Sequence, residues 1–293
     1  MSVMRLLLAL LLTATSVIAA DQAILGMVVV KGGLLPPASK LAGESVANFY
    51  IAKCEVTWVE WQTVRTFAVA HGYDLDGSGA GSADSHPVRE VSWFDVVKWC
   101  NAKSEMDGLV PPYQLNGATY KAGETDPTLA KAANGYRLPT DPEWEWAARG
   151  GLSSKGCTYS GSNDVNEVGW FWDNSGGAAV DSCAGKGTWP VGQKPGNELG
   201  LHDMSGNVCE WCFDDVPGIA ARRLRGGRWG DYAGSCTVAI RHYNPPAARD
   251  YGIGFRLARS AGVDIREFKP KRGHRRPEAR AVCGVATLRS AKQ

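Results

Sequence analysis

The stretch that decides the fold is GLHDMSGNVCEW at residues 200–211. It is followed by RGGRW at residues 225–229 and by GFRL at residues 254–257. These motifs are short and combine glycine with aromatic residues, and no internal repeat surrounds them. The arrangement predicts one α+β domain with short strands, few helices and long structured loops.

Capping residues predict three helices before that stretch. Thr57 and Glu60 have the spacing of a capping box, Ser92 opens a second helix, and Thr140 with Glu143 begins a third. A capping box satisfies backbone N–H groups that have no partner inside the helix. These residues therefore place the helical part of the domain.

Strands and packed loops are expected to form the rest of the domain. Residues 27–30 and 48–56 read as strands. The roughly 50 residues after the third helix are rich in Gly, Asn and Ser and show no convincing period. Because Trp170, Trp172 and Trp189 lie in this region, we expect aromatic packing to order it.

The composition is that of a loop-rich globular protein. The 293 residues are 44% hydrophobic and 21% charged, with 35 Gly, 15 Pro and 11 Trp. That content of glycine and proline argues against a helical bundle, and the lack of a three-residue period excludes collagen. The formal net charge of +2 excludes a protein that coats nucleic acid, so no nucleic-acid partner is expected.

The two ends of the chain differ from the domain between them. Residues 1–20 have one arginine, a leucine-rich stretch and then small residues, which predicts a secretory signal peptide and a secreted or periplasmic protein. No second apolar run approaches the length of a transmembrane helix. Residues 261–293 predict a basic, disordered tail, for which contact with an anionic surface stays open. The domain at 21–260 is acidic, with 27 Asp or Glu against 22 Lys or Arg.

Eight cysteines in an oxidising compartment favour disulfides. A bond between Cys157 and Cys183 would cross-link a segment with few apolar anchors. Cys100 lies on the apolar face of a predicted helix and reads as a buried thiol. Cys209 and Cys212 have the spacing of a redox motif, but no helix is predicted to start there, so a structural role is favoured.

The order of these motifs resembles the formylglycine-generating enzyme family, also called the sulfatase-modifying factor family. The further matching segments are MVVVKGG at 27–33, EVT at 55–57, HPVREVSW at 86–93 and YRLPTDPEWEWAAR at 136–149. The resemblance covers about residues 27–260 and implies the family's variant of the C-type lectin fold.

Enzymes of that family oxidise a sulfatase cysteine to formylglycine with copper held by two thiolates. In this chain the first thiolate position is Asp231, the second is Cys236, and Arg228 replaces a serine that usually follows the Gly-Gly pair. A hard carboxylate does not replace a thiolate on Cu(I), so the chain looks like a divergent member for which copper is not expected. Asp231 and Cys236 stay as catalytic candidates, with a buried or disulfide-bonded Cys236 as the alternative.

The resemblance also implies a calcium site. Its ligands in this chain would be the set Asp203, Gly206, Val208 and Glu210. Ca²⁺ takes six to eight hard oxygen ligands, and two carboxylates around a glycine turn suit it. The alternative is that Asp203 and Glu210 cap turns and pair with arginines. A second family site would begin at Asn174 and Ser175, without a matching acidic partner. Residues 74–79 resemble a calcium loop but fail the EF-hand spacing.

The segment from Arg228 to Gly252 has the composition of a binding surface. Its candidate ligand-binding residues are Arg228, Trp229, Asp231, Tyr232, Arg241, His242, Tyr243 and Tyr251. Rigid aromatic rings with short polar groups are typical of paratopes, and the segment resembles that of variable proteins made by diversity-generating retroelements. Ordinary loops packed over a tryptophan-rich core are the alternative.

Three functions stay open from the sequence. The first is a secreted, calcium-stabilised module that binds a protein, peptide or glycan. The second is an oxidoreductase, with an altered formylglycine-generating centre or a non-haem metal, acting on a protein cysteine or a small molecule. The third is a structural protein attached through its tail. Whether the chain is an enzyme is left open, since fold does not determine activity.

Overall fold

Capping boxes start the three longer helices, as the sequence predicts. In the computed structural model, Thr57 caps α1 (Trp58–Ala70), Ser92 caps α2 (Trp93–Met106) and Thr140 caps α3 (Asp141–Ala148). Each cap accepts a hydrogen bond from the third helical residue, whose carboxylate bonds back to the cap. The structure describes residues 26–130, 133–177 and 185–261, so the predicted signal peptide, Cys183 and all but the first residue of the tail lie outside the described residues.

A four-stranded sheet carries the motifs that follow the third helix. Its order is β10-β9-β8-β11, with β8 (Cys209–Val216) and β9 (Ile219–Arg225) forming a hairpin and β11 running parallel to β8. The edge strands are β10 (His242–Asn244) and β11 (Ile253–Gly254). This hairpin has the longest strands among the described residues, and the sequence did not indicate it.

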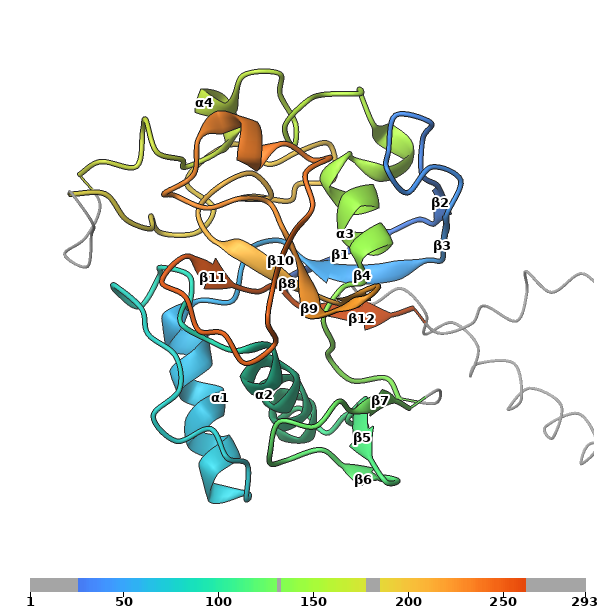
Figure 1. Cartoon of the computed structure of the whole chain (residues 1–293), viewed down its shortest axis with the longest axis vertical. Coiled ribbons are helices and arrows are strands. Elements are labelled where there is room, and N and C mark those ends of the chain that lie inside the picture. The colour runs from blue at the N-terminus through green and yellow to red at the C-terminus, as the bar shows by residue number, and fades with distance from the viewer. Residues whose placement is uncertain (1–25, 131–132, 178–184, 262–293) are drawn as a thin grey trace, which may run out of the picture. The chain divides into compact units, whose positions relative to one another are not determined.

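Smaller sheets complete the domain (Figure 1). The first and last strands of the described part both pair with β4, in a sheet of β1 (Met27–Val30), β4 (Phe49–Ala52) and β12 (Ala258–Ser260). The other pairings join β2 (Gly33–Leu34) to β3 (Ser45–Val46), and β5 (Tyr113–Leu115) to both β6 (Ala118–Thr119) and β7 (Thr128–Leu129). Both strands expected near the start of the domain are present, the second as the shorter β4.

Tryptophan and phenylalanine rings fill the core. Trp61 and Trp99 stack with centroids 5.7 Å apart, and Phe255 meets both rings edge-on. Cys100 is fully buried beside them, as its place on α2 predicts. The predicted α+β fold with short strands and few helices is confirmed.

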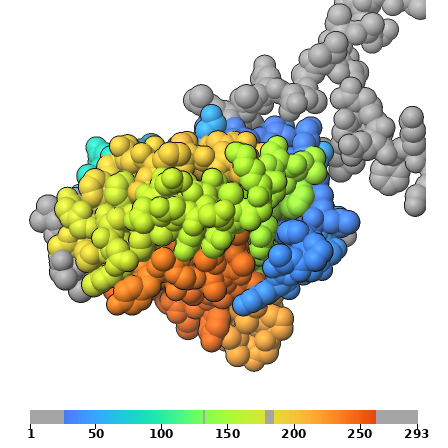
Figure 2. All heavy atoms as spheres, turned by 90° about the horizontal axis from the view of Figure 1, so that it is seen from above, coloured from blue at the N-terminus to red at the C-terminus, as the bar shows by residue number. Residues whose placement is uncertain are grey.

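The region after α3 is built mostly from loops, as expected. Its regular elements are the short helices η1 (Gly151–Ser153) and α4 (Val165–Val168), with η2 (Ala233–Cys236) further along the chain. Trp170 and Trp189 stack with centroids 4.3 Å apart, so aromatic packing does order these loops. In Figure 2 the orange segment that follows β9 reaches the surface beside this yellow-green loop region.

Candidate functional site

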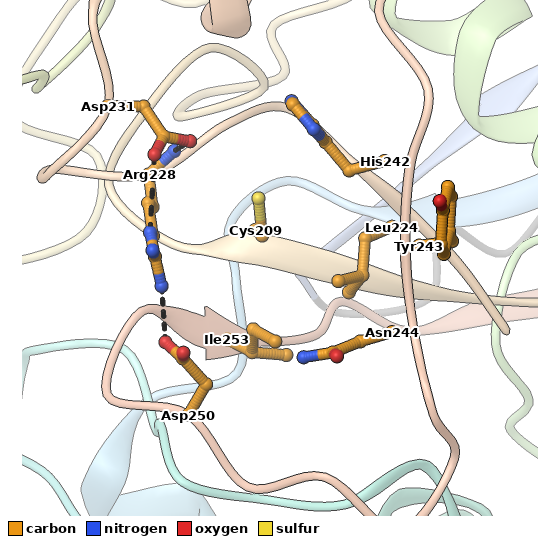
Figure 3. A pocket seen from close by; sticks show the side chains of 9 residues that line it. All are labelled: Cys209, Leu224, Arg228, Asp231, His242, Tyr243, Asn244, Asp250 and Ile253. Carbon is orange, nitrogen blue, oxygen red and sulfur yellow. Dashed lines mark hydrogen bonds and ion pairs between the residues drawn. The ribbon is translucent and has the colours of Figure 1, made fainter. Parts of the chain in front are cut away.

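A cavity of about 190 Å³ opens where β8, β9, β10 and β11 meet the loop after β9. Its lining consists of Cys209, Leu224, Arg228, Asp231, His242, Tyr243, Asn244, Asp250 and Ile253. Figure 3 shows Cys209 on β8 between the Arg228 group and the side chains of β10. The floor is thus apolar and the walls are polar, which is the usual character of a small binding site.

Arg228 forms one wall with two carboxylates. Its backbone N–H and Nε donate hydrogen bonds to Asp231, at 3.2 and 3.3 Å, and its guanidinium pairs with Asp250. Asp250 also accepts the N–H of Gly252 at 2.8 Å. Asp231 is therefore engaged with an arginine, and its carboxylate is a hard group where Cu(I) prefers a soft thiolate.

Both thiols near this cavity are protonated at neutral pH. Burial raises the pKa of Cys236 to about 12 and raises the pKa of Cys209 well above its usual range. Cys236 is fully buried on η2, and a Cβ on Gly227 would lie 2.8 Å from its Sγ. The six described cysteines, including Cys157, are free thiols; the predicted partner Cys183 lies outside the described residues. Neither thiol has the electropositive, accessible setting of a reactive cysteine.

Exposed tyrosines lie at the cavity or near its lining residues, and Tyr243 is part of the lining. The chain has nine tyrosines, and the exposed ones are Tyr232, Tyr243 and Tyr251, at 69%, 58% and 48% of their surface. Tyr251 lies against the Arg228 guanidinium at 5.1 Å, and Tyr232 lies near Trp172 at 6.3 Å. Three aromatic rings kept in solvent at or near one cavity are a feature of binding surfaces.

Two other residues expected on this surface lie elsewhere. Trp229 is only 3% exposed and packs against Tyr251 with centroids 5.5 Å apart, so it lies beneath the tyrosines. Arg241 does not line the cavity, because its guanidinium pairs with Asp141 at the start of α3.

The two carboxylates of the expected calcium set have different surroundings. Asp203 is 2% exposed; its Oδ2 accepts the N–H of Gly192 at 2.6 Å, while its Oδ1 is buried with no hydrogen-bond partner among the described residues. Glu210 is fully buried and accepts hydrogen bonds from Arg256 at 2.5 and 2.7 Å and from Trp144 Nε1 at 2.6 Å. Glu210 thus pairs with an arginine, whereas Asp203 has a free oxygen.

A third buried carboxylate, Glu55, joins them. It accepts hydrogen bonds from the N–H of Val208 at 3.1 Å and from the Asn207 amide at 2.7 Å. Burial raises the pKa values of Glu55 and Asp203, and their mutual repulsion adds to the rise for Glu55, while the Arg256 guanidinium lowers both. Three carboxylates thus face one guanidinium in the interior.

The residues expected to begin a second calcium site have local roles. The Asn174 amide donates to the Gly169 carbonyl and accepts the N–H of Phe171, both at 2.9 Å. Ser175 is buried and donates to the Trp229 carbonyl at 2.9 Å. Among the described residues, no three His, Cys, Asp or Glu side chains converge as a metal cluster.

The sequence did not indicate Cys209, Leu224 and Ile253 as parts of the site, whereas Asn244 and Asp250 belong to the segment from Arg228 to Gly252 whose composition is that of a binding surface. Placing those three residues together needed the pairing of β8 with β9 and β11, which the motifs alone did not reveal.

This α+β scaffold has the sulfatase-modifying-factor fold. The loop after its Gly-Gly pair lines the cavity. Residues 14–261 match the model of the sulfatase-modifying factor enzyme 1-like domain, and the chain belongs to that family. No helix of the described part is long and apolar enough to cross a membrane.

Three similar proteins differ in their named roles. The chain is 36% identical to the chaperone protein LppX of Paenibacillus barcinonensis, over 69% of this chain and 78% of that protein. It is 38% identical to the inactive C-alpha-formylglycine-generating enzyme 2 of Mus musculus, over 64% of this chain and 53% of that protein. The structure of Treponema denticola variable protein 1 superposes with a TM-score of 0.62 at 28% identity, covering 80% of this chain and 94% of that chain.

Proposed function

We propose that this chain is a ligand-binding module, secreted or periplasmic, rather than a copper-dependent generator of formylglycine. The observation that carries the proposal is the exposure of three tyrosines at the cavity on Cys209. Tyr243 lines the cavity, Tyr251 lies against Arg228 in its wall, and Tyr232 follows Asp231 of that wall in the chain. Tyrosine provides large contact area at low entropic cost, and the neighbouring Asn244 and His242 provide adaptable hydrogen bonds.

The ligand that we propose is a polypeptide. LppX, at 36% identity, carries the name of a chaperone, and the variable protein of Treponema has the same fold. The cavity of about 190 Å³ has room for one large side chain, with the tyrosines beside it for the flanking residues. A polar wall over an apolar floor suits a side chain with one polar end.

The surroundings of the copper position support a function without copper. Cu(I) selects soft thiolate ligands. Asp231 supplies a carboxylate that is already bonded to Arg228, and Cys236 is a buried thiol whose pKa is raised to about 12. The similar mouse protein is named an inactive C-alpha-formylglycine-generating enzyme, which agrees with a function without copper.

We also propose that calcium stabilises the loops beneath the surface. The buried Oδ1 of Asp203 has no hydrogen-bond partner among the described residues, and the three carboxylates Glu55, Asp203 and Glu210 outnumber the one nearby guanidinium, that of Arg256. A buried charge needs a partner, and a hard divalent cation with carboxylate and carbonyl ligands provides one. Asp203, Glu210 and the carbonyls of Gly206 and Val208 would hold it.

Metal analysis of the purified protein, together with oxygen uptake on a sulfatase-type cysteine peptide, tests the enzymatic part. We expect no stoichiometric copper and no oxygen uptake; copper with turnover would overturn the proposal.

A peptide display library, with a glycan array in parallel, tests the binding part. We expect peptide capture that Tyr243→Ser abolishes and that Leu152→Ser leaves unchanged, because Leu152 is 70% exposed outside the cavity. Capture that ignores Tyr243, or capture of glycans alone, would contradict a polypeptide ligand at this surface.

A further inference from the structure

Four arginines gather around α3, and alternation along β9 places Arg223 and Arg225 on the opposite face of the sheet from Leu224, which lines the cavity. They are Arg149, Arg223, Arg225 and Arg241. Two buried carboxylates are shared among them: Asp141 is 1% exposed at its side chain, and Glu145 is fully buried. Glu145 forms ion pairs with Arg149, at 2.7 Å, and with Arg225, rather than with Arg223 or Arg241.

Asp141 lies among three of these arginines, although its Oδ1 has ion-pair contact only and no hydrogen-bond partner among the described residues. Its Oδ1 lies 2.8 Å from Arg225 Nε, and its Oδ2 accepts the Nε of Arg241 at 2.7 Å. Arg223 reaches the same Oδ2 only at 3.8 Å, which is too long for a hydrogen bond. Arg223 Nε is buried and has no hydrogen-bond partner among the described residues.

Neighbouring arginines repel the Arg223 guanidinium. Burial lowers the pKa of its guanidinium, and Arg241 and Arg225 lower it further, against the opposing effect of Asp141 and Asp214. Arginine keeps its charge under these conditions, so the repulsion is relieved by an anion rather than by loss of a proton.

The site is open at the edge of the sheet. Arg223 lies on β9 directly opposite Tyr243 of the edge strand β10, and Tyr243 is 58% exposed. The side chains of Arg223 and Arg241 keep 13% and 21% of their surface in solvent. A ligand can therefore approach two guanidinium groups at this edge without unfolding the cluster.

We propose that Arg223 and Arg241 form an oxyanion-binding site at the edge of β10. The planar forks of arginine match carboxylate, phosphate and sulfate groups, and bonds between charged partners are the stronger class. Tyr243 borders both this site and the cavity on Cys209, but the anion site does not depend on the proposed polypeptide ligand.

Thermal unfolding in phosphate or acetate, each compared with chloride at the same ionic strength, tests the site. With phosphate at ten times its dissociation constant, binding to the folded state alone should raise the midpoint by about 3–6 °C. The larger response of the two anions identifies a phosphoryl or a carboxylate group as the preferred one. Equal midpoints in phosphate, acetate and chloride would overturn the proposal.

Variants at Arg223 test whether the anion that raises the thermal midpoint binds at this residue. Arg223→Gln should lose the response, and Arg223→Lys, which keeps the charge without the planar fork, should lose most of it. Lys53→Gln removes one exposed positive charge outside the cluster and should keep the full response. If both Arg223 variants fold and respond like the wild type, the anion acts elsewhere and the proposal fails.

Discussion

The Asp231 carboxylate accepts hydrogen bonds from both the backbone N–H and the Nε of Arg228. By the family resemblance, these two residues stand where the copper-binding segment has a thiolate and a serine. They form a unit, because the Asp231 carboxylate holds one part of the arginine and Asp250 holds its other end. Together they build one wall of the cavity.

Placing the family's residues at both positions should create a copper site. The double variant Arg228→Ser with Asp231→Cys places a second thiol five positions before Cys236, and we expect it to bind one Cu(I) ion per chain in competition with a chromogenic chelator. Arg228→Ser alone keeps the carboxylate and should bind none. Equal copper uptake by the wild type and the double variant would show that Asp231 does not prevent binding.

Gly227 should not tolerate alanine. Its φ is +72°, and a Cβ would lie 2.7 Å from the Ser235 carbonyl and 2.8 Å from Cys236 Sγ. We expect Gly227→Ala to lower the free energy of unfolding by about 2–4 kcal/mol, measured by denaturant titration. Gly230→Ala is the matched control, since a Cβ there meets nothing within 4 Å and Gly230 has no positive φ. Similar losses for both variants would contradict this account of the Gly-Gly turn.

Asp214 should make the protein less stable as the pH rises toward neutrality. Burial, and repulsion from Asp141 and Glu143, raise its pKa to about 6 from an ordinary value of 3.8. Between these two values the folded state binds more protons than the unfolded state, so the stability from this group is complete below about pH 4 and is lost by about pH 6.

Replacement of Asp214 by asparagine should reduce the dependence of stability on pH in that range. Asparagine can still accept the N–H of Asp141, so Asp214→Asn should gain about 1–2 kcal/mol relative to the wild type at pH 7. Denaturant titrations across the pH range measure it, with the exposed neighbour Asp215→Asn as control. An unchanged slope in Asp214→Asn would assign the pH dependence to other groups.

The sequence predicted the elements that interactions between neighbouring residues determine. Capping at Thr57, Ser92 and Thr140 placed three helices, because a cap acts within one helical turn. The β8–β9 hairpin escaped prediction because its strands lack a clean alternation: Glu210 and Arg225 pair with each other across the ladder and are both buried.

The candidate site was predicted in part for the same reason. The segment from Arg228 to Tyr251 is contiguous, so its composition alone marked it as a surface. Sequence could not separate the exposed Tyr232 from the buried Trp229, because neighbours from other segments, such as Ser175, decide burial. The pairing of Glu210 with Arg256 likewise joins residues 46 positions apart.

Calcium removal should lower the stability of the protein, and Asp203 should be the residue responsible. A chelator is expected to reduce the thermal midpoint of the wild type, because a ligand that binds the folded state alone stabilises it by mass action. Asp203→Asn removes the charge whose Oδ1 has no other partner among the described residues, so its midpoint should no longer depend on calcium. Asp76→Asn is the matched control: Asp76 is exposed in the segment at 74–79 that fails the EF-hand spacing, and its variant should respond to the chelator like the wild type. A wild-type midpoint that is the same with calcium and with chelator would contradict the calcium site, and it would mean that Glu55 or Asp203, whose pKa values are raised by burial, is protonated in the folded protein.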